Sequence, residues 1–350
     1  MTRPISFGLA GVAHYHAGFW AQAVVDMPEA RLAGVWDPDE ARGRNVADQY
    51  GVPFFRDLRA LLRACDAVGV ATETVKHAAV VEEAAAAGVH ILCEKPMAAT
   101  LADCDRIEQA VRTSGVVFMQ NYPKRFDPVN HELVRRVHRG DLGRVVLVRV
   151  RHGHCHGLDP AFGQQWFADP AYSGGGALLD EGVHAADFLL WLLGTPVDVT
   201  ATVSRAALGL PVEDTAAAVF TFPDGALAEV TASWTFVAAE QSVEVYGTEG
   251  AALLSGVDLA SREFATPPYL RLFRRRGVSR TWEAVPVVPA FVGDTFHHGG
   301  PRHFVDCLRQ HRTPPVGVRE GRRAVEMILA AYRAAATGTS QRIPMTGGAR

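Results

Sequence analysis

Short apolar runs alternate with longer amphipathic stretches over the first third of the chain. The runs read as β-strands at residues 5–10, 31–36, 67–72, 90–94 and 116–120. Between them, alanine-rich segments with apolar residues every three or four positions predict helices, clearest at 77–87 and 101–113. Gly88 and Gly115 follow these two segments, where helix C-caps belong. Strand–helix–strand repetition requires a parallel sheet with right-handed crossovers, so we expect a doubly wound α/β domain over residues 1–122.

The pattern changes from about residue 145. Strand-like segments at 145–151, 197–207, 216–222, 227–236 and 242–246 follow one another, several with alternating apolar and polar positions. Pro223, Asp224 and Gly225 make a tight turn between two of them, which indicates an antiparallel hairpin. Helical patterns occur at 183–193, 301–310 and 319–337. We therefore expect a second domain over residues 123–350, of the α+β class, with a large open, mainly antiparallel sheet and helices on one face.

Composition narrows the class of protein. The 350 residues agree with two domains, and 48% hydrophobic with 21% charged residues describes a globular chain. The net charge of −3 argues against a nucleic-acid binder. The chain has no apolar run long enough for a membrane helix and no signal-peptide pattern at its start. Five scattered cysteines without a CxxC pair favour reduced thiols and a cytoplasmic location: Cys65, Cys93, Cys104, Cys155 and Cys307.

The first two predicted strands end in residues suited to a dinucleotide. Gly11 supplies the tight turn before a helix, although Ala13 and His16 occupy the later glycine positions of a GxGxxG pattern, so the motif alone is weak. Asp37 follows the second strand, where a carboxylate can accept hydrogen bonds from both ribose hydroxyls. The alternative is that Asp37 caps a helix beginning at Pro38, and both roles can coexist. Because no arginine directly follows Asp37, we expect NAD rather than NADP.

Two further segments carry chemistry that folding does not require. Glu94, Lys95 and Pro96 end the fourth strand, and a cis bond before Pro96 would fix the direction of Lys95, whose simpler interpretation is a surface lysine. After the glycines at 174–176 come Asp180, His184 and Asp187, spaced to share one helix face. A carboxylate beside an imidazole suits proton transfer, although a helix cap with a core histidine fits this segment equally well.

Together these segments resemble the Gfo/Idh/MocA oxidoreductases, the family of glucose–fructose oxidoreductase and inositol dehydrogenase. The resemblance rests on the strand-one turn, on Glu94-Lys95-Pro96 and on the 174–187 segment, and it extends to residues 125–128, 302–306 and 330–332. It implies an N-terminal Rossmann domain, NAD as cofactor with NADP less favoured, and hydride transfer at a secondary alcohol or ketone of a sugar, cyclitol or related polyol. It also implies a catalytic set of Lys95, Asp180 and His184, and a homodimer or homotetramer formed through the C-terminal sheet.

The resemblance assigns further positions. The expected cofactor-binding residues are Gly11, Ala13, His14, Tyr15, Asp37, Thr72, Glu73, His77, Glu94, Lys95, Pro96 and Asn121. The expected substrate-binding residues are Lys95, Arg125, His152, His154, Trp166, Asp180 and His184. The sequence departs from the family at Ala13 and His14, where glycines are frequent, at Glu73, where proline is frequent, and at Glu181, where apolar residues are usual.

Three alternatives stay open. His152, His154 and His156 alternate along a strand and can bind a divalent metal, although we expect no metal because the family chemistry does not need one. An NAD-assisted enzyme without net redox change, in which transient oxidation enables elimination or glycoside cleavage, would use the same three catalytic residues. A nucleotide- or sugar-sensing regulator with the same fold is less favoured, because a sensor needs none of the three.

Overall fold

The computed structural model describes residues 3–275 and 281–345, in two compact units. The first unit combines Met1–Pro123 with Asp294–Arg322, and the second combines Lys124–Gly293 with Arg323–Arg350. The predicted boundary after residue 122 is close to the point at Pro123 where the chain leaves the first unit. The return of residues 294–322 to that unit was not indicated by the sequence. Helix α12 (Val318–Thr337) therefore begins in the first unit and continues in the second.

The first unit contains a parallel five-stranded sheet with the order β2-β1-β3-β4-β5, as the alternation of apolar runs predicted. Its strands are β1 (Ile5–Ala10), β2 (Ala30–Trp36), β3 (Ala67–Val70), β4 (His90–Cys93) and β5 (Phe118–Gln120). Its helices are α1 (His16–Val25), α2 (Glu40–Tyr50), α3 (Leu58–Arg63), α4 (His77–Ala86), α5 (Leu101–Ser114) and α11 (Gly299–Arg309). The predicted Rossmann-type α/β fold is confirmed.

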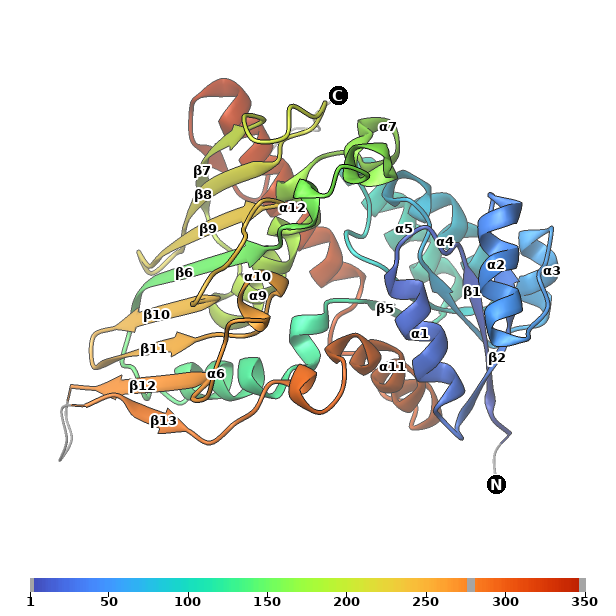
Figure 1. Cartoon of the computed structure of the whole chain (residues 1–350), viewed down its shortest axis with the longest axis horizontal. Helices are drawn as coiled ribbons and strands as arrows, with labels where there is room; N and C mark the ends of the chain where they lie inside the picture. The colour runs from blue at the N-terminus through green and yellow to red at the C-terminus, as the bar shows by residue number, and fades with distance from the viewer. Residues whose placement is uncertain (1–2, 276–280, 346–350) are drawn as a thin grey trace. The chain divides into compact units, whose positions relative to one another are not determined.

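The strand order of this sheet changes direction at β1. The chain moves from β1 to β2 in one direction, and from β3 to β4 and β5 in the other, so right-handed crossovers put α1 on one face and α4 and α5 on the opposite face (Figure 1). On the α1 side, Phe304 of α11 packs edge-on against Phe7 of β1, with ring centroids 6.4 Å apart. The carboxyl ends of β1 and β3 flank the switch point, where ligands bind in such sheets.

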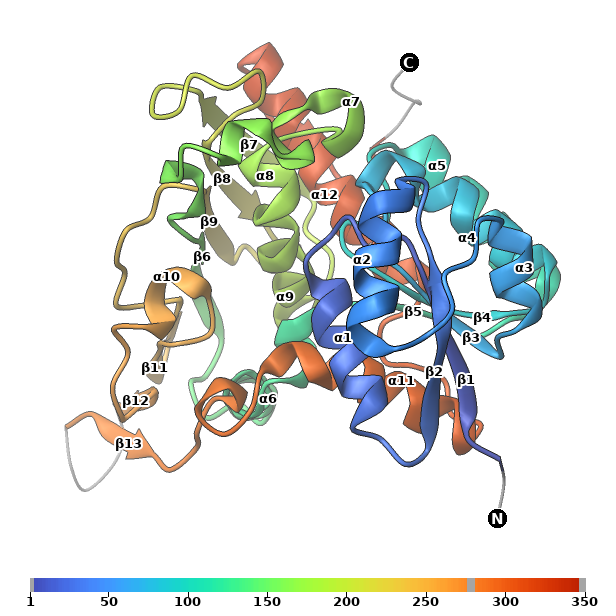
Figure 2. The same ribbon diagram turned by 45° about the vertical axis from the view of Figure 1, so that its right-hand side comes forward.

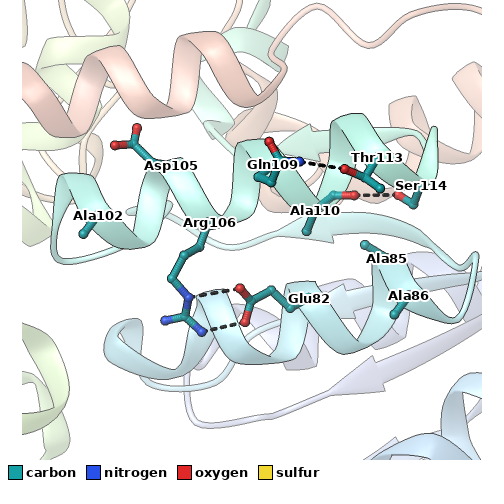
Figure 3. Close-up of a pocket in the computed structure, with 10 residues that line it drawn as sticks. All are labelled: Glu82, Ala85, Ala86, Ala102, Asp105, Arg106, Gln109, Ala110, Thr113 and Ser114. Atoms are coloured by element: carbon teal, nitrogen blue, oxygen red, sulfur yellow. Dashed lines mark hydrogen bonds and ion pairs between the residues drawn. The ribbon is translucent and has the colours of Figure 1, made fainter.

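Helices α4 and α5 form a groove on the surface of the first unit. Alanines line much of it, and Arg106 of α5 donates from Nε to Glu82 of α4 at 3.0 Å across it (Figure 3). Its remaining lining residues are Ala85, Ala86, Ala102, Asp105, Gln109, Ala110, Thr113 and Ser114. Because no predicted site residue lines this groove, we do not assign it to the active site.

The second unit contains a nine-stranded sheet with the order β13-β12-β11-β10-β6-β9-β8-β7-β14. Strands β6 and β9 pair in parallel and the other described pairs are antiparallel, so the expected mainly antiparallel sheet is confirmed. The strands are β6 (Val145–Gly153), β7 (Asp198–Ser204), β8 (Thr215–Thr221), β9 (Leu227–Ser233), β10 (Val243–Gly247), β11 (Gly250–Leu254), β12 (Leu270–Arg274), β13 (Glu283–Val285) and β14 (Gln341–Arg342). The last four are short strands that the sequence analysis missed.

Helices cover one face of this sheet. They are α6 (Pro128–His138), α8 (Ala177–Asp180), α9 (Gly182–Leu193) and α10 (Leu259–Arg262), with the second part of α12, while the short α7 (Pro170–Ser173) packs on the 3-10 turn Trp166–Ala168. Helix α9 packs on β6 and β9, and α8 packs on β8 and β9 (Figure 2). The predicted turn joins β8 to β9 in an antiparallel hairpin, with Gly225 at φ 84°. Among the described residues, no helix combines the length and the apolar character needed to cross a membrane.

A buried carboxylate fixes the glycine turn that leads into α8. The Glu213 side chain accepts hydrogen bonds from the N–H of Gly176 at 3.1 Å, from the N–H of Leu178 at 2.9 Å and from the Tyr332 hydroxyl at 2.6 Å. The backbone oxygen of Glu213 accepts the N–H of Ala177 at 2.9 Å. A Cβ atom on Gly176 would lie 2.0 Å from this oxygen, so the close approach requires glycine. The turn therefore determines where Asp180, at the end of α8, is presented.

We expect Gly176→Ala to lower the free energy of unfolding by roughly 3 kcal/mol, because the added methyl group must push the turn away from Glu213. Urea denaturation followed by circular dichroism measures this loss. Gly163→Ala is the matched control, since a Cβ at Gly163 meets only Leu210 at 3.5 Å, an ordinary contact. Equal stability of the two variants would contradict the role given to the turn.

Candidate active site

The turn after β1 requires a glycine at its first position. Gly11 has φ 87°, and a Cβ there would lie 2.2 Å from Cγ2 of Thr72. Helix α1 begins at His16 without a hydrogen bond from an N-cap side chain. Instead, Nδ1 of His14 accepts the N–H of His16 at 3.2 Å, so this imidazole performs part of the capping. The turn and the helix start after it fit a dinucleotide, since the helix dipole favours negative charge at this end.

Asp37 lies directly after β2 and is buried. Its Oδ2 accepts the N–H of Val12 at 2.7 Å and its Oδ1 accepts the N–H of Asp39 at 2.7 Å. The N-cap of α2 is Asp39, which accepts hydrogen bonds from the N–H groups of Ala41 and Arg42. The capping alternative for Asp37 was therefore wrong. Asp37 instead joins the end of β2 to the turn after β1, as expected of a carboxylate at a ribose site.

His77 holds the ends of β3 and β4 together. Its Nε2 lies 3.0 Å from the carbonyl oxygen of Thr72, and its Nδ1 lies 3.0 Å from that of Pro96. The ring is buried, and burial lowers the pKa of His77. The Lys95–Pro96 peptide bond is cis, as the sequence analysis considered. The contacts of His77 are thus with two loop carbonyls at the edge of the sheet where the cofactor is expected.

Glu94 is a fully buried carboxyl group that directly precedes Lys95. Its Oε2 accepts a hydrogen bond from Nδ2 of Asn121 at 3.1 Å, and its Oε1 lies 3.1 Å from Nδ1 of His16. Burial raises the pKa of Glu94 to about 7, although the Lys95 charge and the Asn121 hydrogen bond act in the opposite direction. Lys95 itself is 3% exposed. Four predicted cofactor positions, His14, Glu94, Lys95 and Asn121, therefore lie in or next to one buried polar cluster of the first unit.

In the second unit, Asp180 is oriented by a tryptophan that the sequence analysis missed. Nε1 of Trp234, which is fully buried, donates to Oδ2 of Asp180 at 2.9 Å. His184 lies in the first turn of α9 and its ring stacks on His152 with centroids 4.7 Å apart. Trp234 follows β9 without any motif around it, so only the pairing of β9 with β6 and β8 brings it to this place.

Glu181 joins two histidines of the predicted substrate set. Its Oε2 lies 2.6 Å from Nδ1 of His152, and its Oε1 lies 3.5 Å from Nε2 of His154. Burial alone would raise the pKa of Glu181, but His154 and His152 outweigh it and hold the pKa well below its usual value. Burial lowers the pKa of His152. The arrangement is therefore a carboxylate that accepts hydrogen bonds from two imidazoles.

Two groups of residues have ligand atoms close enough to consider a metal ion. The first is His14, His16 and Glu94, and the second is His154, Asp180 and Glu181. In the second group, Nδ1 of His154 accepts the N–H of His156 at 3.2 Å, so the neutral ring carries its proton on Nε2, the atom facing Glu181. His14 has the same arrangement with the N–H of His16. A metal-bound histidine normally donates from its other nitrogen, and here that nitrogen accepts, which disfavours a metal at both places.

Arg125 and Trp166 lie in contacts internal to the second unit. The Arg125 guanidinium is nearly buried and donates from Nε and Nη2 to the two carboxylate oxygens of Asp187, each at 2.8 Å. It also lies 4.9 Å from the Trp191 ring centroid. Trp166 stacks on Phe167 with centroids 3.9 Å apart. The bidentate pair occupies much of Arg125, so its substrate-binding role stays a prediction without support from these contacts.

The neighbouring Lys124 is a buried cation that the sequence analysis missed. Its ammonium group is enclosed and makes no hydrogen bond to any described residue. Burial lowers the pKa of Lys124 to about 8, while the negative charges of Asp258, Asp127 and Glu181 act in the opposite direction. A buried ammonium group without a hydrogen-bonding partner is costly, which marks a place where a ligand oxygen would be stabilised. The sequence signal that could have identified Lys124 is its place directly before Arg125, a predicted substrate-binding residue.

Comparison with known proteins agrees with this geometry. The family description "Oxidoreductase family, NAD-binding Rossmann fold" matches residues 5–122, and "GFO/IDH/MocA C-terminal domain" matches residues 131–253. The chain is 31% identical to 1,5-anhydro-D-fructose reductase of Ensifer adhaerens over 280 residues, which is 79% of this chain and 80% of that protein. It is 28% identical to D-apiose dehydrogenase of Paraburkholderia graminis over 350 residues, 95% of this chain and 87% of that protein.

A solved structure extends the likeness to the whole fold. The aldose-aldose oxidoreductase of Caulobacter crescentus, complexed with glycerol, superimposes with a TM-score of 0.82 at 26% identity, covering 97% of this chain and all of that one. Both halves of the chain, the NAD-binding fold and the sheet domain, thus match one family in the expected order. The chain belongs to the Gfo/Idh/MocA family of oxidoreductases and is an NAD-dependent enzyme of that family.

Proposed function

We propose that this enzyme transfers hydride between NAD and a secondary alcohol or ketone of a sugar, cyclitol or related polyol, with Lys95, Asp180 and His184 as its catalytic residues. The observation that carries the proposal is the polar cluster of the second unit, which gathers at the α8–α9 junction and at the end of β6: Asp180, Glu181, His184, His152 and His154. The named activities of relatives support the substrate class, since they include a D-apiose dehydrogenase and a scyllo-inositol 2-dehydrogenase.

Each catalytic residue has a distinct role in this proposal. The imidazole of His184 accepts the proton of the substrate hydroxyl as the C–H bond breaks and the carbonyl forms. The Lys95 ammonium group donates a hydrogen bond to the same oxygen, and Asp180, held by Trp234, orients the acid–base pair. When bound, NAD supplies the hydride acceptor. In the reducing direction the same groups return the proton to the carbonyl oxygen.

The remaining polar residues suit a neutral, hydroxylated substrate. His152 and His154 each donate toward Glu181, which leaves the carboxylate able to accept hydroxyl hydrogens as well. Lys124 can donate to a substrate oxygen from its buried ammonium group. Trp166 and Arg125 complete the predicted set, as an aromatic surface and as the residue that anchors the Lys124 segment to Asp187. A polyol needs hydrogen-bond donors and acceptors in comparable number, because each of its hydroxyl groups can both donate and accept.

We also propose that the chain self-associates through the open face of its large sheet and works in the cytoplasm. Strand alternation turns Val219 and Leu227 away from the helix-covered face, and they are 38% and 42% exposed. Arg149 pairs with Glu229 at 2.8 Å on the same face. Apolar side chains beside fixed charges suit a dimer or tetramer interface. The five free cysteines support the cytoplasmic location, because thiols stay reduced there.

We expect Lys95→Met to leave NAD binding within about threefold while kcat falls at least a hundredfold, because a general hydrogen-bond donor to the reacting oxygen is lost. A screen of sugars, inositols and their keto forms identifies the substrate, and NADH absorbance gives the rate. Unchanged turnover would refute the catalytic assignment. Product formed without net NADH would instead identify an enzyme that uses transient oxidation.

The buried carboxyl beside Lys95 predicts a pH dependence of stability. Glu94 has a pKa of about 7 in the native state and 4.5 as its reference value. Between these values the unfolded chain has lost the proton and the native chain keeps it, so stability falls as the pH rises and levels off above about 7. The free energy of unfolding of Glu94→Gln, relative to that of wild type, should be higher at pH 8 than at pH 4 by up to about 3 kcal/mol. Chemical denaturation at both pH values measures this, with Glu108→Gln on the exposed side of α5 as the control.

Removal of divalent cations should not change the activity. The neutral rings of His154 and His14 carry their protons on the nitrogens that would have to bind the ion. We therefore expect dialysis against EDTA to leave both kcat and the melting temperature unchanged. A loss of activity that zinc or manganese restores would contradict this and assign a metal to one of the two clusters.

A further inference from the structure

An arginine and a second carboxylate surround Asp37. Arg42, in the first turn of α2, donates to Oδ1 of Asp37 from Nη2 at 2.8 Å and approaches both carboxylate oxygens with Nε at 3.2 Å. The same Nη2 donates to Oε1 of Glu73 at 3.1 Å. Lys76 approaches Oε2 of Glu73 at 2.9 Å. The Asp37 and Glu73 side chains are 0% and 7% exposed, while Arg42 is 29% exposed.

This network occupies the oxygens that a ribose needs. Asp37 already accepts the backbone N–H groups of Val12 and Asp39, which are held by the turn and cannot move away. Arg42 is the side chain on Asp37 that can rotate. A ribose diol that binds Asp37 therefore has to displace the Arg42 guanidinium, at least from one oxygen. After displacement, Arg42 still has Glu73 as a partner.

The position of Arg42 bears directly on the 2′ substituent of the cofactor. A guanidinium beside the ribose carboxylate is the group that pairs with a 2′-phosphate, and a phosphate accepts it bidentately. The net charge of this network is close to zero, because the two carboxylates, Asp37 and Glu73, balance the two cations, Arg42 and Lys76. Because Glu73 is buried, its charge is poorly screened, and both cations keep its pKa below the usual value although burial acts to raise it. A phosphate would thus compete with Glu73 for Arg42.

We propose that Glu73 is a positioning residue that makes the enzyme selective for NAD, because it retains Arg42 and so withholds it from a 2′-phosphate. Arg42 is the residue that would bind that phosphate. Glu73 stands where proline is frequent in the family, so this selectivity is built from a residue of this chain as well as from Asp37. The inference rests on NAD binding at the proposed site, and it concerns only which nucleotide the site prefers.

The test measures dissociation constants for NAD+ and NADP+ by titration calorimetry, without any sugar substrate. In Glu73→Gln, we expect NADP+ to bind about tenfold more tightly than in wild type, while NAD+ binds no more tightly, because the displaced Arg42 then lacks the Glu73 carboxylate as a partner. In the double variant Glu73→Gln/Arg42→Gln, this gain should disappear. Arg44→Gln is the matched control, because Arg44 lies on the same helix but pairs with the exposed Glu40.

The outcomes separate the inference from the proposed function. An unchanged NAD+/NADP+ ratio in Glu73→Gln, or a gain that survives loss of Arg42, overturns the role of Glu73. The single variant Arg42→Gln provides a second measurement that does not depend on Glu73. In this variant, NADP+ should bind at least about fivefold more weakly than in wild type, and NAD+ should bind equally well or more tightly. Wild-type protein that binds neither nucleotide would refute the NAD-dependent function itself. Melting temperatures of all variants show that each is folded.

Discussion

A buried carboxylate must have its hydrogen-bonding capacity satisfied, and this requirement at Glu213 positions the segment of the second unit that carries Asp180. Two backbone N–H groups of the glycine turn and the Tyr332 hydroxyl all point to one carboxylate. The turn can come this close only because Gly176 has no side chain. Helix α8 starts from it and ends at Asp180, where Trp234 supplies the next hydrogen bond. The orientation of Asp180 therefore depends on hydrogen bonds made by Glu213, Tyr332 and Trp234.

The same requirement organises the first unit. Asp37 accepts a hydrogen bond from the N–H of Val12 and so joins the first two strands at the expected ribose site. Glu94, beside Lys95, accepts a hydrogen bond from Asn121 and lies within hydrogen-bond distance of His16. The two carboxyls differ in what surrounds them. Asp37 faces a guanidinium and backbone donors, whereas burial dominates at Glu94 and raises its pKa to about 7. Two loops at the carboxyl end of this sheet thus hold carboxyl groups in different surroundings, one paired with Arg42 and one that titrates near neutral pH beside Lys95.

Much of the fold could be predicted because its signals are local. The apolar runs at 5–10 and 90–94 and the turn at Gly225 coincide with observed elements to within a residue or two. Strands β11 to β14 could not be found, since each is short and is stabilised by its neighbours in the sheet rather than by its own pattern. The parallel pairing of β6 with β9 was also hidden, because sequence order alone suggests hairpins between consecutive strands. The segment 294–322 joins the first unit through contacts such as Phe304 with Phe7, which no local pattern announces.

The residues of the candidate site divide in the same way. By itself, the sequence determined the fold class, the cofactor turn at Gly11, the carboxylate at Asp37, and Lys95, Asp180 and His184 as candidates, because these depend on residue type and spacing along the chain. Tertiary structure alone decided that Asp39 rather than Asp37 caps α2, and that Arg42 pairs with Asp37. In the second unit it decided that Arg125 pairs with Asp187, that Trp234 donates to Asp180, that Glu213 accepts the glycine turn, and that Lys124 is enclosed. Hydrogen-bond partners far apart in sequence are chosen by burial, which forces each enclosed polar atom to pair with whatever donor the packing brings within reach.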